Sequence, residues 1–414
     1  MESFIYRDGE LHCDGVSVAK IAASVGTPFY LYSAAAVERN YRLFEDALAG
    51  VAHLTCFSVK ANSNLAVLRL LRDLGSGFDI VSSGELYRLR EVGADPRRIL
   101  FSGVGKTDQE LQDALQEGIL QFNVESEAEL ARLNALAGVR SAAAPVALRV
   151  NPAVDSGTHH YISTGLPTHK FGIPMDRARR IYAQPHRYPH LSFTGVSCHI
   201  GSQITALYPF EQAVTLLSEL VLQVREQVTT LRFADIGGGL GIRYQDEQPP
   251  SVDDYIKAVC RHLVPLKLTL LLEPGRRIVG EAGILVTRVV LTKESSTKRF
   301  VVVDAAMNDL IRPTLYGAFH AVEPVREPSR LTAEPVDIVG PVCESGDFFA
   351  RDRPLAPVET GDLLAIRNAG AYGYSQASNY NSRRRPAEVM VQGGAFRTVR
   401  ERESYADLVR GERM

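Results

Sequence analysis

The stretch LTCFSVKAN at residues 54–62 decides the fold. Its apolar and β-branched run is typical of a buried strand, and the run leads directly to Lys60. Burying an ammonium group without a partner is costly, although a lysine at a strand end can also reach solvent along its flexible stem. We therefore interpret Lys60 as a functional residue at the end of a buried strand, with a surface lysine as the alternative.

Short apolar segments of this kind recur along the chain and alternate with segments of helical period. Strands are predicted at residues 54–59, 78–82, 99–102, 121–125, 145–150, 193–199, 232–237 and 268–273. Helices are predicted at residues 34–47, 64–74, 84–92, 108–117, 127–136, 209–228 and 252–263. This regular order favours a closed parallel barrel over residues 36–280, and an open doubly wound sheet is the runner-up.

The pattern changes after residue 280. Strand-like segments separated by Gly, Pro and Asp turns follow at residues 284–294, 299–305, 335–340, 362–368 and 387–394. They predict an all-β domain formed by residues 1–35 and 281–414, which the strand-like segment at 28–33 could join. The predicted fold class is therefore α/β, a (β/α)8 TIM-type barrel with a second, all-β domain.

The composition of the chain excludes some classes of function. A net charge of -2 over 414 residues gives no electrostatic case for binding nucleic acid or an anionic membrane. The five cysteines are scattered and contain no C-x-x-C pair, so we predict neither a disulfide framework nor a metal site. We recognise no secretory signal and no membrane span, and we expect a cytoplasmic protein that acts on a small molecule.

Polar residues or glycines stand at the predicted C-terminal ends of the barrel strands, where barrel enzymes carry their catalytic groups. Plainer interpretations exist for single members, namely a helix N-cap for Ser102 or Glu125 and a core position for His199. The whole set is harder to explain in that way. It consists of Lys60, Asp79, Ser102, Glu125, Asn151, His199, the glycines at 237–239 and Glu273.

Two turns predict a phosphate site. DIGGGLG at 235–241 places three glycines directly after a strand, so that backbone N–H groups can face an anion, and CHIGSQI at 198–204 offers a second turn with Ser202. The spacing is not the G-x-G-x-x-G of dinucleotide-binding folds. With Lys60 for an imine, His199 for a ring face and Glu273 for a ring nitrogen, these turns complete the parts that pyridoxal phosphate requires.

Nine ordered motifs resemble the diaminopimelate decarboxylase family of fold-type III pyridoxal phosphate enzymes over essentially the whole chain. They are FSVKAN, FDIVSSGEL, HKFGI, CHIGSQI, DIGGGLG, EPGR, DAAMNDLIRPTLYGA, GPVCESGDFF and GAYGYSQASNYNSR. The resemblance implies that Lys60 forms the Schiff base, that His199 covers one ring face and that Glu273 pairs with the ring nitrogen. It implies further cofactor contacts by Asp79, Ser202, Gly238, Gly239, Pro274, Gly275, Arg276 and Tyr372.

By the same resemblance the substrate-binding residues are Arg276, Arg312, Tyr316, Glu344 and Tyr372. Cys343 is the implied proton donor, supplied by the β-domain of the partner subunit in a homodimer with shared sites. The implied reaction converts meso-2,6-diaminopimelate to L-lysine and CO2, the last step of lysine biosynthesis.

Other members of the same enzyme class are alternatives. Decarboxylases of ornithine, arginine or carboxynorspermidine are the nearest, but the guanidinium groups of Arg276 and Arg312 suit a second carboxylate and would repel the cationic end of ornithine or arginine. An amino-acid racemase would need a two-base pair in place of the single acid Cys343. A cofactor-homeostasis protein with a similar barrel is disfavoured because such proteins lack the β-domain.

Overall fold

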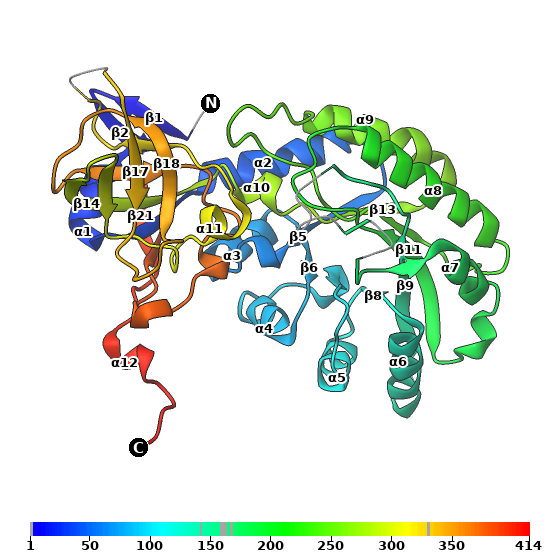
Figure 1. Cartoon of the computed structure of the whole chain (residues 1–414). Helices are drawn as coiled ribbons and strands as arrows, with labels where there is room; N and C mark the ends of the chain where they lie inside the picture. Colours follow the sequence, from blue (N-terminus) through cyan, green and yellow to red (C-terminus); the bar gives the residue numbers. More distant parts are fainter. Residues whose placement is uncertain (1–2, 141–142, 158–163, 166–168, 329–331) are drawn as a thin grey trace. The chain divides into compact units, whose positions relative to one another are not determined.

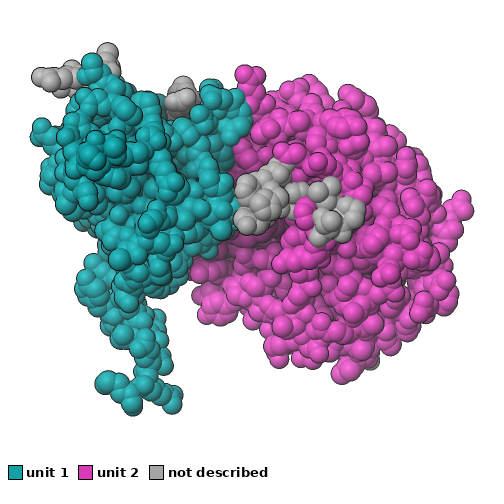
Figure 2. All heavy atoms as spheres, viewed as in Figure 1, with its two compact units in different colours: residues 1–39, 243–247, 278–414 teal, residues 40–242, 248–277 magenta. Residues whose placement is uncertain are grey.

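The computed structural model describes residues 3–140, 143–157, 164–165, 169–328 and 332–414. The chain divides into two compact units (Figure 2). One, called the barrel unit below, contains Asn40–Ile242 and Gln248–Arg277. The other, called the β unit, contains Met1–Arg39, Arg243–Glu247 and Ile278–Met414. Each unit is described by itself.

The barrel unit is built on a sheet that closes on itself. Its parallel strands pair in the order β5-β6-β7-β8-β9-β11-β12-β13, and β13 pairs back with β5. The predicted (β/α)8 barrel is therefore confirmed over the doubly wound alternative. The strands are β5 (His53–Ser58), β6 (Gly77–Ile80), β7 (Ile99–Phe101), β8 (Gln121–Val124), β9 (Ala144–Asn151), β11 (Leu191–Cys198), β12 (Phe233–Asp235) and β13 (Thr269–Leu272).

Helices cover the outside of the barrel (Figure 1). They are α3 (Leu65–Asp73), α4 (Ser83–Glu91), α5 (Asp108–Glu117), α6 (Glu127–Val139), α7 (Met175–Tyr182), α8 (Tyr208–Val224) and α9 (Val252–Leu263). The sequence did not predict α7, which has only eight residues and three arginines. The buried hydroxyl of Tyr182 anchors α7, because it donates to Gly195 O (2.8 Å) and accepts from Leu148 N–H (3.0 Å) where the β9–β11 register shifts.

The β unit consists mostly of sheet. Its main path runs β18-β17-β15-β14-β4-β20-β21, and β19 joins both β14 and β16. The N-terminal β4 pairs with β14 on one side and β20 on the other, so the segment at 28–33 does join this sheet. The strands are β4 (Phe29–Ser33), β14 (Gly283–Glu294), β15 (Arg299–Val303), β16 (Val322–Pro324), β17 (Glu334–Val339), β18 (Phe348–Leu355), β19 (Leu363–Ile366), β20 (Ala387–Gln392) and β21 (Ala395–Arg400).

Smaller elements complete the chain. A three-stranded sheet of β1 (Phe4–Arg7), β2 (Glu10–Cys13) and β3 (Val16–Ser17) precedes α1 (Val18–Val25), and α2 (Ala34–Ala47) leads into β5. Short helices α10 (Arg276–Val279), α11 (Arg312–Tyr316) and α12 (Tyr405–Leu408) lie in the second half. Within the described residues, no helix has both the length and the apolar character needed to cross a bilayer.

Candidate active site

Lys60 lies on a single 3-10 turn directly after β5, at the C-terminal mouth of the barrel. Its Nζ is 2.6 Å from Oδ2 of Asp79, which comes from the neighbouring strand β6 and is completely buried. The side chain of Lys60 remains 33% exposed, so it is not sealed in the barrel interior as Asp79 is. The ammonium group of Lys60 is therefore neither unpaired nor a plain surface charge.

Glu273, which follows β13, is a buried carboxyl group in the barrel interior. Its Oε1 lies 3.2 Å from Asn123 Nδ2 on β8, and the same amide nitrogen lies 2.8 Å from Oδ2 of Asp235 on β12. Asn123 is held in turn by Gln121, whose amide donates to Asn123 Oδ1 (3.0 Å). A hydrogen-bonded network therefore joins two carboxyl groups that come from adjacent strands.

The two carboxyl groups differ in the hydrogen bonds that stabilise their charged forms. Asp235 accepts from the Gly237 N–H (2.9 Å), the Ser197 hydroxyl (3.0 Å) and Asn123 (2.8 Å). Burial, followed by the charges of Asp235 and Asp79, raises the pKa of Glu273 well above its usual range. Burial raises the pKa of Asp235 as well, but its hydrogen-bond donors act in the opposite direction. The pair therefore keeps its negative charge on Asp235, the better supported group, and its proton on Glu273.

His199, directly after β11, is fixed in one tautomer. The Gly238 N–H donates to His199 Nδ1 (3.1 Å), so Nδ1 carries a lone pair and the neutral ring keeps its proton on Nε2. Burial, followed by the charges of Arg149 and Lys60, lowers the pKa of His199 well below its usual range. The ring is therefore uncharged near neutrality, which suits stacking against another ring better than ion pairing.

The two glycine-containing turns are tied together. Ile204 N–H donates to Gly239 O (2.9 Å), and the side chain of Gln203 makes two hydrogen bonds to the backbone of Ile242. A Cβ on Gly238 would approach Glu273 O to 2.2 Å, and Gly239 has a φ of +118°. Glycine is therefore required at both positions for the turn to pass so close to the end of β13.

Arg276 and Ser202 connect this pair of turns to the EPGR segment. The Arg276 Nη2 donates to Ser202 Oγ (3.0 Å), and Arg276 is almost completely buried. In the segment between Glu273 and Arg276, a Cβ on Gly275 would meet the Ala61 side chain at 2.9 Å. The backbone of Gly275 therefore packs closely against the turn that carries Lys60.

The other predicted site residues belong to the β unit. Arg312 begins helix α11, and Tyr316 ends it and accepts a hydrogen bond from Gln376 (3.4 Å). Thr314, between them, donates to Gly346 O (2.6 Å) and so joins α11 to the turn that carries Cys343 and Glu344. Tyr372 has a φ of +56°, a left-handed conformation that is uncommon for an aromatic residue.

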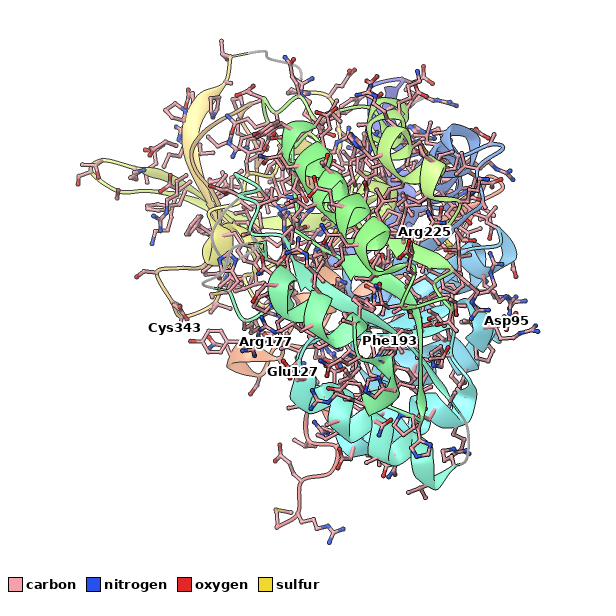
Figure 3. The ribbon with its side chains drawn as sticks, turned by 90° about the vertical axis from the view of Figure 1, so that its right-hand side faces the viewer. Asp95, Glu127, Arg177, Phe193, Arg225 and Cys343 are labelled. Carbon is pink, nitrogen blue, oxygen red and sulfur yellow. The ribbon has the colours of Figure 1, made fainter. Side chains whose placement is uncertain are left out.

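Cys343 and Glu344 are both exposed and lie on one turn of the β unit. Cys343 can be followed in Figure 3. Asp347 organises this turn, since its carboxylate accepts from Met307 N–H and Val342 N–H, both at 2.7 Å. Asn381 Oδ1 accepts from Cys343 N–H (3.1 Å). The other four cysteines are also free thiols, and three of them are buried. Cys343 is thus the exposed thiol, placed beside a carboxylate.

Several residues at the barrel mouth were missed or left open by sequence reasoning. Ser102 and Glu125 are not N-caps, because Thr107 caps α5 and Ser126 caps α6. Ser102 Oγ lies 3.5 Å from Glu273, and Glu125 forms a buried ion pair with Arg149 at 2.8 Å. Asp235 and Asn123 were not predicted, although Asp235 ends a strand two residues before the first of the three glycines and could have been found from that position.

Glu85 was also missed. It lies in the first turn of α4, accepts from Val81 N–H (2.7 Å), and burial raises its pKa to about 7. The charge of Lys60 lowers the pKa of Glu85, so the two side chains interact electrostatically at the barrel mouth. Asn151 Nδ2 donates to Phe171 O (3.1 Å), and its Oδ1 accepts from Ala153 N–H (2.9 Å), so its side chain organises the backbone that follows β9.

The barrel mouth fits pyridoxal phosphate by the chemistry of its donors. An accessible lysine amine stands beside a buried carboxylate, and a protonated carboxyl group is available for a ring nitrogen. A neutral imidazole, glycine turns without Cβ atoms and a buried arginine meet the needs of a ring face and a phosphate. These features define a pyridoxal phosphate enzyme of the barrel class.

Comparison with known proteins leads to the same class and then narrows it. Residues 34–280 match the family described as "Pyridoxal-dependent decarboxylase, pyridoxal binding domain". The chain is 53% identical to the diaminopimelate decarboxylase of Pseudomonas aeruginosa, covering 100% of this chain and 99% of that protein. The chain belongs to the diaminopimelate decarboxylase family, as predicted, and the predicted cofactor and carboxy-lyase class are confirmed.

Solved structures agree with this assignment. The structure of diaminopimelate decarboxylase from M. jannaschii in co-complex with L-lysine has a TM-score of 0.94 at 37% identity, covering 100% of this chain and 98% of that chain. The Helicobacter pylori diaminopimelate decarboxylase complexed with L-lysine has a TM-score of 0.92 at 40% identity, covering 95% and 98%.

The proton on Glu273 gives a testable pH dependence. Because the pKa of Glu273 is raised in the folded chain, its stabilising contribution is complete below the unfolded pKa of ~4.3 and is lost as the pH rises through the folded pKa. Glu273→Gln keeps a neutral group of the same shape. In the absence of cofactor, the variant should therefore gain thermal stability relative to the native protein as the pH rises from about 5 to 8. Each ~1 kcal/mol of difference in the free energy of unfolding should appear as a few °C of difference in Tm.

Thermal unfolding followed by circular dichroism would measure this difference at each pH. Glu226→Gln, which removes an exposed carboxylate, is the control and should show no such trend. A difference between Glu273→Gln and the native protein that stays constant across this range would contradict the assignment of the proton to Glu273.

Proposed function

We propose that the protein catalyses the pyridoxal phosphate-dependent decarboxylation of meso-2,6-diaminopimelate to L-lysine and CO2, the last step of lysine biosynthesis. The observation that carries this proposal is the pairing of Lys60 with Asp79 at the same barrel mouth as the proton-holding Glu273. Membership of the diaminopimelate decarboxylase family supplies the substrate class. A cytoplasmic location is proposed on the same basis, together with the free cysteines.

The residues of the barrel unit bind and orient the cofactor. When bound, pyridoxal phosphate forms an imine with an amine and accepts into its ring the electron pair that remains when CO2 leaves. Lys60 provides the amine that attaches the group, and Asp79 holds the Lys60 side chain. Glu273 would keep a proton at the ring nitrogen, and the neutral His199 would cover a ring face. Ser202, Gly238, Gly239 and the segment 273–276 receive the phosphate.

The residues of the β unit, together with Arg276 of the barrel unit, are proposed to recognise the substrate. A planar guanidinium can hold a carboxylate by two parallel hydrogen bonds, so Arg312 and Arg276 suit the carboxylate that is not removed. Glu344 receives the distal ammonium group, and Tyr316 and Tyr372 complete the binding site. Cys343 supplies the proton that replaces CO2. We propose that this turn comes from the partner subunit of a homodimer.

The cofactor attachment can be tested by chemical trapping. Reduction of the protein with borohydride in the presence of pyridoxal phosphate should fix the cofactor covalently on Lys60, as found by mass spectrometry of peptides. Lys106 is an internal comparison, because its completely buried Nζ is paired with Glu129 at 2.7 Å. Lys60→Ala should take up no label. Label on Lys106 or Lys170 in the native protein would refute the attachment site.

The substrate can be tested with a panel of amino acids. Native protein should release CO2 from meso-diaminopimelate and form L-lysine. Ornithine, arginine and lysine lack a second carboxylate, and each lost charge-assisted hydrogen bond of roughly 1.5–3 kcal/mol should lower kcat/KM by about one to two decades. Comparable rates with ornithine would show a decarboxylase of another basic amino acid. Epimerisation without CO2 release would show a racemase.

The shared site can be tested by complementation. Lys60→Ala and Cys343→Ala should each be inactive alone. After subunit exchange at equal concentrations, activity should return to about a quarter of the native value, because half of the dimers are hybrids and each hybrid has one intact site. Exchange is verified with differently tagged chains. No recovery of activity despite verified exchange would place both residues in the same subunit's site.

A further inference from the structure

His320 stands behind the proposed carboxylate-binding Arg312, and no role has been given to it above. The His320 side chain is completely buried in the β unit, and Arg312 is 5% exposed. Arg312 Nη1 lies 2.8 Å from His320 Nε2. On the other side of the ring, His320 Nδ1 lies 2.7 Å from the backbone oxygen of Arg367.

These two contacts determine the protonation of the imidazole ring. A guanidinium has only donors, so His320 Nε2 must accept from Arg312. A carbonyl oxygen has only acceptors, so Nδ1 must donate to Arg367 O. His320 is therefore the neutral tautomer with its proton on Nδ1, and both ring nitrogens are used.

The surroundings restrain the same pair of side chains. The Arg312 guanidinium lies 4.6 Å from the centroid of the Tyr244 ring, and that ring packs edge-on against the His320 ring at 5.3 Å and 75°. Arg353 donates to the backbone oxygen of His320 (2.9 Å). A salt bridge between Arg367 and Glu323 (2.5 Å) supports the strand segment that accepts from His320. The guanidinium plane of Arg312 is thus fixed at one edge and along one face.

We propose that His320 is a positioning residue that sets the selectivity for substrates with a second carboxylate, by holding the guanidinium of Arg312 in the orientation that a carboxylate requires. This inference rests on the proposed role of Arg312. A guanidinium that is free to rotate keeps its charge but no longer aligns two N–H groups with the two oxygens of a carboxylate. Recognition by this planar group depends on that alignment.

Two substitutions separate the two ends of the imidazole. Asn places its amide near Nδ1, so His320→Asn keeps a donor for Arg367 O and loses the acceptor for Arg312. Gln places its amide oxygen near Nε2, so His320→Gln keeps the acceptor for Arg312. Two variants with similar amide side chains therefore differ mainly in the contact that the proposal invokes.

Equilibrium binding to the holoenzyme provides the measurement. L-lysine keeps the carboxylate that is not removed, whereas 1,5-diaminopentane lacks it, and the ratio of their inhibition constants reports carboxylate recognition alone. His320→Asn should reduce the preference for L-lysine by about tenfold or more, the scale of one hydrogen bond to a charged group, and should raise KM for meso-diaminopimelate more than it lowers kcat. His320→Gln should retain most of the preference.

Arg312→Lys separates failure of this inference from failure of the proposed function. If Arg312→Lys leaves the preference for L-lysine unchanged, Arg312 does not bind the carboxylate, and its role in the proposed function is contradicted. If Arg312→Lys abolishes the preference but a folded His320→Asn protein keeps it, His320 does not position Arg312. If His320→Asn does not fold, His320→Gln decides the matter, and a folded His320→Gln holoenzyme without the preference overturns the inference.

Discussion

A carboxyl group can be buried inside a closed barrel only if its polar atoms are satisfied, and the interior of this barrel is arranged around that requirement for Glu273. Asn123 spans from Glu273 to Asp235, and Gln121 fixes the orientation of the Asn123 amide. Without the amide the two carboxyl groups would face each other with only a shared proton between them. The network allows the fold to keep a protonated acid where apolar side chains would otherwise pack.

The same interior restricts the backbone around it. Gly238 must pass next to the carbonyl oxygen of Glu273, where a Cβ would be 2.2 Å away. That close passage also brings the Gly238 N–H to His199, so one glycine fixes the tautomer of the imidazole as well as the path of the turn. The side-chain amide of Gln203 then joins the two turns. It donates to Ile242 O and accepts from Ile242 N–H, the pair of hydrogen bonds that a neighbouring strand would make. The proposed phosphate-binding turns are therefore a consequence of how β11, β12 and β13 end.

Sequence patterns predicted much of this, and the limits have physical causes. All the barrel strands were found because each is a short apolar run bounded by turns, and Lys60, Asp79, His199 and Glu273 were found because strand ends meet at one mouth. Helix α7 was missed because its buried face has few residues.

Other residues were missed because the contacts that define them are distant in sequence. Asn123 and Asp235 are 112 positions apart, and the Arg312 acceptor His320 depends on a backbone oxygen of Arg367 for its tautomer. Periodicity describes which face a residue occupies, but it does not describe which partner a buried polar group will find.

Glu273 and Arg312 are nevertheless held in the same way. Each carries the proton or charge that the proposed function assigns to it, and each is held by a neutral side chain that is itself fixed, Asn123 by Gln121 and His320 by Arg367. A neutral partner orients a charged or protonated group without cancelling it, whereas a direct ion pair would occupy the group that has to act on the ligand.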